Sequence, residues 1–451
     1  MIKKADRFTV VSLFLCFSFY LFFAFFDGPV ICVDSPSYIS MQSSREPLYP
    51  LLLAFARIIF KAFPEGVDLY FVVLFQSLLA AAAAFVLTKY LKKELKLSKA
   101  GAFFILGIPL AVSLLCRFAA RRGSMYSNSI LTEGITISLY LIFFRHLLEY
   151  VYHQRQKSLV WCMGLCFFMI SARKQMIIAL MMLVFSILFI AVWKKSLTYG
   201  LLTVTGSFVL VLGASAILDI GYNYMVRGEK MIHSGDVRFI TTVAFYTATG
   251  EDVILIEDPQ VGELFGEIWG QCEEQGYLRN SAGQGWSNRV SHFGDHYDHI
   301  QIDTMWPMVN SHVQGNYECR QEQISEYADQ IMKEISRAVI PAHFSEVLGI
   351  FADNFLAGLI LTVSQYHVVF IYYSGAVYLF YLIMVVLLVK RGKEGKTATF
   401  AIWTFLSILV NVSLVSLVIF CQTRYTIYNM PLFYMSLIAV LDRSFRKDRG
   451  R

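Results

Sequence analysis

Charged side chains are scarce in this chain. Asp, Glu, Lys and Arg make up 16% of the 451 residues, hydrophobic residues make up 56%, and the mean hydropathy is +0.54. Soluble globular proteins are about 25% charged, so the composition argues against an ordinary cytosolic enzyme. A long basic block is also missing, because the net charge of +6 is spread along the chain. These absences exclude a disordered or nucleic-acid-binding protein and predict a multi-pass membrane protein.

Other common features are absent as well. The first apolar run follows three basic residues, as in a signal peptide. It is too long for one, however, and no small-x-small cleavage site follows Phe26, so we expect an uncleaved first helix. The chain has no internal repeat and no low-complexity linker. Its eight cysteines form no disulfide framework, since only Cys272 and Cys319 share the hydrophilic part, and whether those two form a bridge stays open.

Ten charge-poor apolar runs approach the length of about 20 residues that a membrane-spanning helix needs. They lie at 8–26, 69–88, 100–116, 130–144, 159–172, 176–193, 197–218, 368–389, 398–421 and 425–441. The run at 344–366 carries Glu346, Asp353 and Asn354, which favours a helix lying on the membrane surface. The predicted fold class is an all-α multi-pass membrane protein with about ten transmembrane helices.

The distribution of Lys and Arg predicts the orientation of these helices. If the N-terminus is cytoplasmic, every cytoplasmic connection is basic, and these connections hold 22 of the 39 basic residues. Both termini are then cytoplasmic, and the hydrophilic segment 221–343, with 18 acidic and 8 basic residues, lies outside. Its glycines and helical stretches predict a compact, α-rich external domain.

The chain is therefore expected to have three parts. Residues 1–220 form a transmembrane module of about seven helices with a first outer loop at 28–68. Residues 221–343 form the external domain. Residues 344–451 add the surface helix and three further transmembrane helices.

Nine basic residues fall in short connections on the predicted outer side, where basic residues should be rare. They are Arg45, Arg57, Lys61, Arg117, Arg121, Arg122, Arg173, Lys174 and Arg424. Charges at membrane depth are costly unless they are paired or functional, so we expect an anionic ligand on this side. Arg can hold a phosphate through two hydrogen bonds. The candidates for binding a phosphate are Arg121, Arg122, Arg173, Lys174 and Arg424.

The first outer loop concentrates polar residues around Asp34. An apolar stretch at 51–63 follows; it is too short to span and predicts a helix along the membrane surface. Asp34 is either the cap of a helix that begins at Ser35-Pro36 or a catalytic carboxylate, and the basic residues on the same side favour catalysis. Candidates for supporting this loop or contacting the acceptor are Tyr38, Arg45, Glu46, Tyr49 and, before the last span, Tyr425.

Glu133 and a group of three histidines are further candidate site residues, and each has an alternative explanation. Glu133 opens the fourth span; it either stabilises a helix N-terminus or faces Asp34 across the outer mouth of the bundle, and both explanations stay open. His292, His296 and His299 have the spacing of one helical face and are weak candidates for binding a metal. Gly294 argues against that site because we expect it to interrupt the helix.

Taken together, these elements resemble the GT-C class of integral membrane glycosyltransferases. The resemblance rests on Asp34-Ser-Pro-Ser-Tyr38 and on Arg45-Glu46-Pro47-Leu48-Tyr49-Pro50-Leu51-Leu52-Leu53, together with Thr132-Glu133, the late external domain and Arg424-Tyr425. The class includes protein O-mannosyltransferases, oligosaccharyltransferases and the aminoarabinose transferases of bacterial lipid A. The resemblance extends over the whole topology, but its motifs are loose, and only the first loop is moderately specific.

The resemblance implies transfer of a sugar from a polyprenyl-phosphate carrier to a glycan, lipid or protein acceptor on the outer face of a bacterial inner membrane. Asp34 corresponds to the catalytic acidic residue of the first loop, and 221–343 would select the acceptor. The chain lacks the Asp-x-Asp or Asp-Glu pair of the family in that loop, so a divalent metal ion is not firmly indicated. Two alternatives stay open: a transporter or flippase of an anionic or lipid-linked substrate, and a polymerase or ligase of lipid-linked glycans.

Overall fold

The computed structural model describes residues 6–119, 123–320, 323–390 and 395–445, which fold into helices joined by short connections. Within these ranges the only β-type pairing is an isolated bridge between Val30 and Ser129. Arg121 and Arg122 lie outside the described residues. The structure confirms the prediction of an all-α multi-pass membrane protein.

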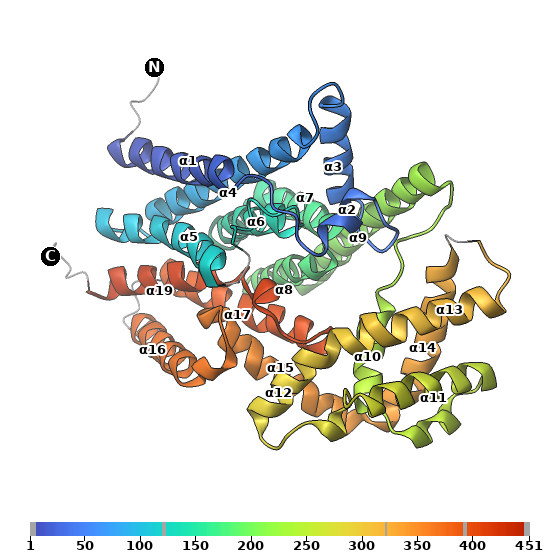
Figure 1. Cartoon of the computed structure of the whole chain (residues 1–451). Coiled ribbons are helices and arrows are strands. Elements are labelled where there is room, and N and C mark those ends of the chain that lie inside the picture. The colour runs from blue at the N-terminus through green and yellow to red at the C-terminus, as the bar shows by residue number, and fades with distance from the viewer. Residues whose placement is uncertain (1–5, 120–122, 321–322, 391–394, 446–451) are drawn as a thin grey trace.

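Besides α15, which is described below, ten of the described helices form a bundle (Figure 1). They are α1 (Arg7–Asp27), α4 (Val67–Glu94), α5 (Lys99–Ala119), α6 (Glu133–His153), α7 (Gln156–Ala172), α8 (Ile177–Trp193), α9 (Leu197–Arg227), α16 (Ile371–Lys390), α17 (Gly395–Val418) and α19 (Met430–Phe445). The C-terminal α19 lies beside α5, where Ser98 N donates to the Asp442 carboxylate over 3.0 Å. Helices from both ends of the chain therefore share one core.

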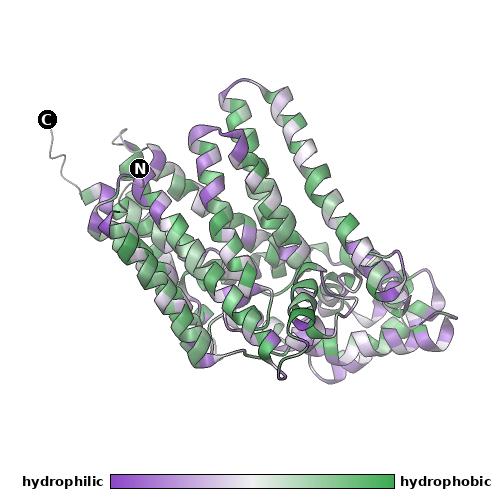
Figure 2. Ribbon diagram, turned by 90° about the horizontal axis from the view of Figure 1, so that it is seen from above, coloured by the Kyte–Doolittle hydropathy of each residue, from purple (hydrophilic) through white to green (hydrophobic). Residues whose placement is uncertain are grey.

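The bundle has two chemically distinct ends. At one, which we call the Glu94 end, Lys396 Nζ lies 2.6 Å and His153 Nε2 2.8 Å from the Glu94 carboxylate. The other, the Asp34 end, holds the first loop with α2 (Ser35–Ile39) and α3 (Leu48–Ile59). Between the two ends the helices expose apolar side chains such as Val209, Leu210 and Ile217 of α9. Figure 2 shows hydrophobic residues along the bundle helices and hydrophilic ones gathered at the loops, as expected for helices that face lipid.

Nine described helices are long and apolar enough to cross a membrane, one fewer than the ten spans predicted. This set includes α15 (Phe344–Ser364), which we expected on the membrane surface, and it omits α7 and α19, which have 17 and 16 residues. The contacts of α15 also place it among the bundle helices, so the expectation of a surface helix is wrong. It packs along α17, and the Tyr378 hydroxyl of α16 donates to Leu359 O over 2.9 Å. Gln365, at its C-terminal end, donates to Thr426 Oγ1 over 2.8 Å at the Asp34 end, and Asp353 pairs with Arg289 of the segment 221–343. Composition and packing therefore both place α15 among the spans, and its two ends also contact the segment 221–343 and the Asp34 end.

The run predicted as one last span at 425–441 is divided. It forms the short α18 (Thr423–Thr426), a connection at 427–429, and then α19. Asn429 supports the break: its Oδ1 accepts from Ser407 Oγ, which in turn lies 2.5 Å from the buried Tyr140 hydroxyl of α6. Backbone without helical hydrogen bonds needs such polar partners at membrane depth. The break sets α18 apart from the axis of α19 and so positions Arg424.

The segment predicted as external folds into an α-rich unit, although α9 continues to Arg227 before it begins. Its elements are α10 (Val237–Thr247), η2 (Gly250–Leu255), α11 (Pro259–Glu274), η3 (Arg279–Ser281), α12 (Trp286–Asp298), the π-helix η4 (His299–Met305), α13 (Trp306–Asn316) and α14 (Ile324–Ala342). Phe245 and Phe265 stack 5.1 Å apart in its own apolar core. Cys272 and Cys319 are both free thiols.

Candidate active site

A chain of ion pairs crosses the Asp34 end of the bundle. Arg45 Nη2 lies 2.9 Å from Asp34 Oδ1, and Arg424 Nη1 lies 2.8 Å from Asp34 Oδ2. Arg424 Nε also lies 2.9 Å from Glu133 Oε1, which Arg173 Nη1 approaches to 2.8 Å. Three guanidinium groups therefore alternate with two carboxylates. We call Arg45, Asp34, Arg424, Glu133 and Arg173 the arginine–carboxylate network.

The network answers the question that the sequence left open for Asp34. Asp34 precedes α2, but its side chain makes no capping hydrogen bond to that helix. Both of its oxygens accept from arginines instead. Asp34 therefore occupies the N-cap position of α2 without capping it through its side chain, and its carboxylate belongs to the network.

Glu133 holds both roles that the sequence allowed. It is the first residue of α6, and its fully buried side chain is separated from Asp34 only by Arg424. The exposed fraction of the side chains is 0% for Glu133 and 10% for Arg173. It is larger for Arg424, at 19%, and for Asp34, at 28%. A ligand would therefore approach from the Asp34 side.

The first loop is pinned to the start of α6 by local hydrogen bonds. Ser35 Oγ donates to Ile130 O over 2.8 Å, and Val30 pairs with Ser129. Gln76 of α4 accepts from the Tyr49 hydroxyl over 2.8 Å and donates to the carbonyl of Ser129. These bonds fix the position of Asp34 relative to Glu133 although the two residues lie far apart in sequence.

Glycine at position 134 is needed for the same arrangement. A Cβ there would lie 2.5 Å from the Gln76 side chain, much closer than any ordinary contact. Gly134 thus lets Gln76 reach the segment before α6.

Gln175 holds the arginines of the network in place. Its Oε1 accepts from Arg173 Nε over 3.0 Å, and its Nε2 donates to Tyr425 O over 2.8 Å. The Tyr425 ring lies 5.3 Å from the guanidinium of Arg173 and 5.6 Å from that of Arg424, so it packs against both cations. Sequence reasoning missed Gln175, although it directly follows the Arg173-Lys174 pair that attracted attention.

The predicted support residues divide into contact and packing roles. The Arg45 guanidinium lies 4.6 Å from the Tyr38 ring, and Tyr38 packs edge-on against the buried Tyr49. Tyr49 is fully buried, so it supports the loop and does not face a ligand. Glu46 accepts from Lys174 N over 2.6 Å, which ties the loop to the connection between α7 and α8.

Lys174 departs from the predicted phosphate cluster. Its ammonium pairs with Asp236, in the connection from α9 to α10, and does not join the network. The same Asp236 lies 3.3 Å from His233 Nε2, and His233 Nδ1 pairs with Asp219, a buried carboxylate near the end of α9. In the sequence, Asp219 is a lone acid that follows an apolar run. This signal could have predicted the second cluster, but the prediction did not use it.

The three histidines were only weak candidates for binding a metal, and in the part of the chain that the structure describes no group of three or more His, Cys, Asp and Glu residues could hold an ion. His292 bonds to the Tyr246 hydroxyl and the Gly276 carbonyl, at 3.1 Å each. His296 and His299 both stack on Tyr277, with ring centres 5.2 Å away. The rings therefore pack and do not converge on a common point.

Gly294 does not interrupt α12, contrary to the expectation. Phe420, in the connection that leads to Arg424, lies where a Cβ on Gly294 would point, at 3.3 Å. The glycine therefore allows α12 to pack closely against this connection.

The electrostatic state of Asp34 follows from two opposing effects. Burial acts to raise its pKa, but Arg424 and Arg45 outweigh burial and hold the pKa below its usual value. Asp34 is thus ionised at neutral pH, and each of its two carboxylate oxygens accepts a hydrogen bond from an arginine. Asp298, the last residue of α12, has a pKa raised by burial and by the Asp34 carboxylate, so this end of α12 lies near the network.

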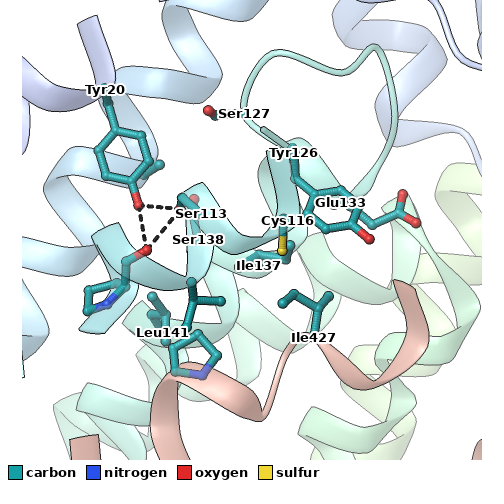
Figure 3. Close-up of a pocket in the computed structure, with 15 residues that line it drawn as sticks. Tyr20, Ser113, Cys116, Tyr126, Ser127, Glu133, Ile137, Ser138, Leu141 and Ile427 are labelled. Atoms are coloured by element: carbon teal, nitrogen blue, oxygen red, sulfur yellow. Dashed lines mark hydrogen bonds between the residues drawn. The ribbon is translucent and has the colours of Figure 1, made fainter. Parts of the chain in front are cut away.

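A small cavity adjoins the network on the bundle side of Glu133. It measures about 40 Å³ and is lined by apolar groups and by the hydroxyls of Tyr20, Ser113 and Ser138 (Figure 3). Tyr20 OH lies 3.0 Å from Ser113 Oγ on the far side of the cavity from Glu133. A space of this size holds water and is too small for a sugar or a lipid.

Comparisons with known proteins assign no family. No family model, no curated protein and no solved structure matches the chain. Fold and site alone therefore define the class: an all-α multi-pass membrane protein with an arginine–carboxylate network at one end of its helix bundle.

Proposed function

We propose that this protein is a membrane glycosyltransferase that moves a sugar from a polyprenyl-phosphate carrier to an acceptor on the outer face of the membrane. The observation that carries the proposal is Arg424, which lies between a partly exposed Asp34 and a buried Glu133. Such a transfer needs a cation for the departing phosphate and a base for the acceptor hydroxyl. Arg424 and Asp34, which lie 2.8 Å apart, are the groups that would fill these two roles.

The network is poorly explained as a device for stability. Replacing buried ion pairs by apolar groups is often neutral or stabilising, because desolvation offsets much of the attraction. Ionisable groups beside membrane spans are for the same reason expected to be functional. The three guanidiniums also exceed the two carboxylates by one positive charge, which a phosphate would neutralise.

In the proposed mechanism the donor phosphate displaces Asp34 from Arg424. Asp34 then loses a cation that lowers its pKa, so it becomes a better base once the donor is bound. The carboxylate accepts the proton of the acceptor hydroxyl, the acceptor oxygen bonds to the anomeric carbon, and the bond from that carbon to the phosphate oxygen breaks. Polyprenyl phosphate leaves with the bonding electrons, and Arg424 and Arg173 stabilise its growing negative charge.

The alternatives differ in what the geometry supports. A transporter is expected to carry ionisable groups near mid-membrane, whereas the ion pairs of Glu94 and of Asp34 lie at the two ends of the bundle. A polymerase or ligase of lipid-linked glycans would use the same chemistry with a longer sugar. The test below distinguishes it by the product.

The test uses the full-length protein in proteoliposomes, a panel of labelled polyprenyl-phosphate sugars and a lipid and glycan extract as acceptor. We expect acceptor-dependent release of polyprenyl phosphate from one donor, lost in Asp34→Asn and kept in Glu65→Gln. Glu65 is an exposed acid of the same outer region without contact to the network. A donor that crosses the membrane unchanged, or no release from any donor, would contradict the proposal.

A further inference from the structure

Arg238 is a half-buried cation that forms no ion pair with any residue that the structure describes. It lies in the first turn of α10, and its guanidinium packs over the rings of Phe239 and Trp306, each 5.2 Å away. Its Nε is fully buried and makes no hydrogen bond, and no ion pair joins the guanidinium to another residue that the structure describes. Arg45, Arg173 and Arg424 differ in this respect, since each pairs with a carboxylate.

The start of α10 lies against the first outer loop. Ser234 N donates to Ser43 O over 3.3 Å, and Gly235 sits between Trp306 and Ser44. Trp306, which covers the Arg238 guanidinium, is therefore next to the residue that precedes Arg45. Arg238 thus adjoins the exposed side of the arginine–carboxylate network, and it belongs to the external unit.

The carboxylates around Arg238 make no ion pair with it, although Asp329 and Asp34 lie near enough to act on its charge. Asp236 pairs with Lys174 and His233, and Asp329 accepts from Gly235 N over 2.8 Å. The second oxygen of Asp329 is buried without a partner, so it does not reach Arg238. Burial and the neighbouring Arg45 both lower the pKa of Arg238, yet a guanidinium stays charged at any physiological pH. An unpaired cation in this position is unfavourable unless a ligand supplies the negative charge.

We propose that Arg238 binds an anionic group, phosphate or carboxylate, on the acceptor substrate. The inference rests on the proposed function, in which Arg424 and Arg173 serve the donor phosphate, so that a cation on the external unit is left for the second substrate. The planar fork of Arg suits an oxyanion with two acceptor oxygens. Trp306 beside it gives the site its own spectroscopic probe.

Binding is measured without any donor, on the full-length protein in phosphatidylcholine nanodiscs. Glycerol 3-phosphate and glycerate are titrated as soluble anions while tryptophan emission is recorded. A second series replaces phosphatidylcholine by increasing amounts of phosphatidic acid. We expect a saturable change in at least one arm that disappears in Trp306→Phe. Arg238→Gln should weaken anion binding about tenfold or more, because it removes a charge-assisted hydrogen bond. Arg238→Lys keeps the charge and should bind with an affinity between those of the wild type and Arg238→Gln.

The matched control is Arg337→Gln, which removes the same charge from an exposed position of α14 in the same unit and should bind like the wild type. A response to soluble anions identifies a water-soluble acceptor, and a response to phosphatidic acid alone identifies a lipid acceptor. No saturable change in any arm, or a change that occurs in Arg238→Gln with the affinity of the wild type, overturns the inference. A melting temperature several degrees lower in unliganded Arg238→Gln also overturns it, since that result indicates a structural arginine.

Different results would overturn the anion site at Arg238 and the proposed glycosyltransferase function. Sugar transfer with an unchanged KM for acceptor in Arg238→Gln would overturn the anion site and leave the transferase intact. Saturable anion binding in a protein that transfers no sugar would overturn the transferase and leave the anion site.

Discussion

Arg424→Lys is the most informative single change at the network. Arg424 uses two different nitrogens, Nη1 toward Asp34 at 2.8 Å and Nε toward Glu133 at 2.9 Å. A lysine has one ammonium nitrogen on a flexible stem and cannot occupy both positions at once. The substitution keeps the positive charge but removes the contact to both carboxylates. It therefore distinguishes a guanidinium that binds a phosphate through two hydrogen bonds from a general attraction between positive charge and lipid.

The structure sets the size of the expected effect. One hydrogen bond to a charged group contributes about 1.5–3 kcal/mol, which corresponds to roughly 10–150-fold in affinity or rate. Since the Arg424 side chain is 19% exposed, we expect the lower end of that range, about tenfold in kcat/KM for the donor. The fold should persist, because Arg173 still pairs with the buried Glu133.

The assay is a donor titration at fixed acceptor on Arg424→Lys, Arg173→Lys and a control, Arg57→Lys. Arg57 is exposed on α3 and donates one bond, over 2.9 Å, to Ile39 O. Its substitution should change kcat/KM by no more than about twofold. Equal, small effects at all three positions would refute the reasoning and indicate a belt of lipid-facing charge in place of a phosphate site.

Three other predictions follow from the same contacts. Asp34→Asn should lower the rate of transfer by about 10²–10⁴-fold in a single-turnover assay, because an amide cannot accept the proton; near-normal turnover would remove Asp34 from the mechanism. Glu133→Gln leaves Arg173 buried without its carboxylate and should lower the unfolding free energy by about 3–5 kcal/mol, which thermal unfolding in detergent would record; an unchanged melting temperature would show that the buried pair is not needed. A cysteine introduced at the exposed Ser281 should react with an impermeant maleimide added to intact cells, and protection there would reverse the proposed orientation.

The choice of site residues could be predicted in part, for a local reason. Asp34, Glu133, Arg173 and Arg424 were selected because each places a charge beside an apolar run, and that cost is visible in a few neighbouring residues. The structure brings these four together with Arg45. Lys174 met the same criterion but turns to Asp236, because the choice between two nearby partners depends on where the connection after α9 folds back.

The sequence by itself determined the fold class, because long apolar runs can satisfy their backbone in a membrane only as helices. It did not determine the place of α15, since the polar residues Glu346, Asp353 and Asn354 favoured a surface helix, whereas the helix packs along α17 within the bundle. The partners of Arg424 and the isolation of Arg238 were decided by tertiary structure alone. Asp34 and Arg424 are 390 positions apart in the chain, and only the packing of the helices brings such distant side chains within one hydrogen bond.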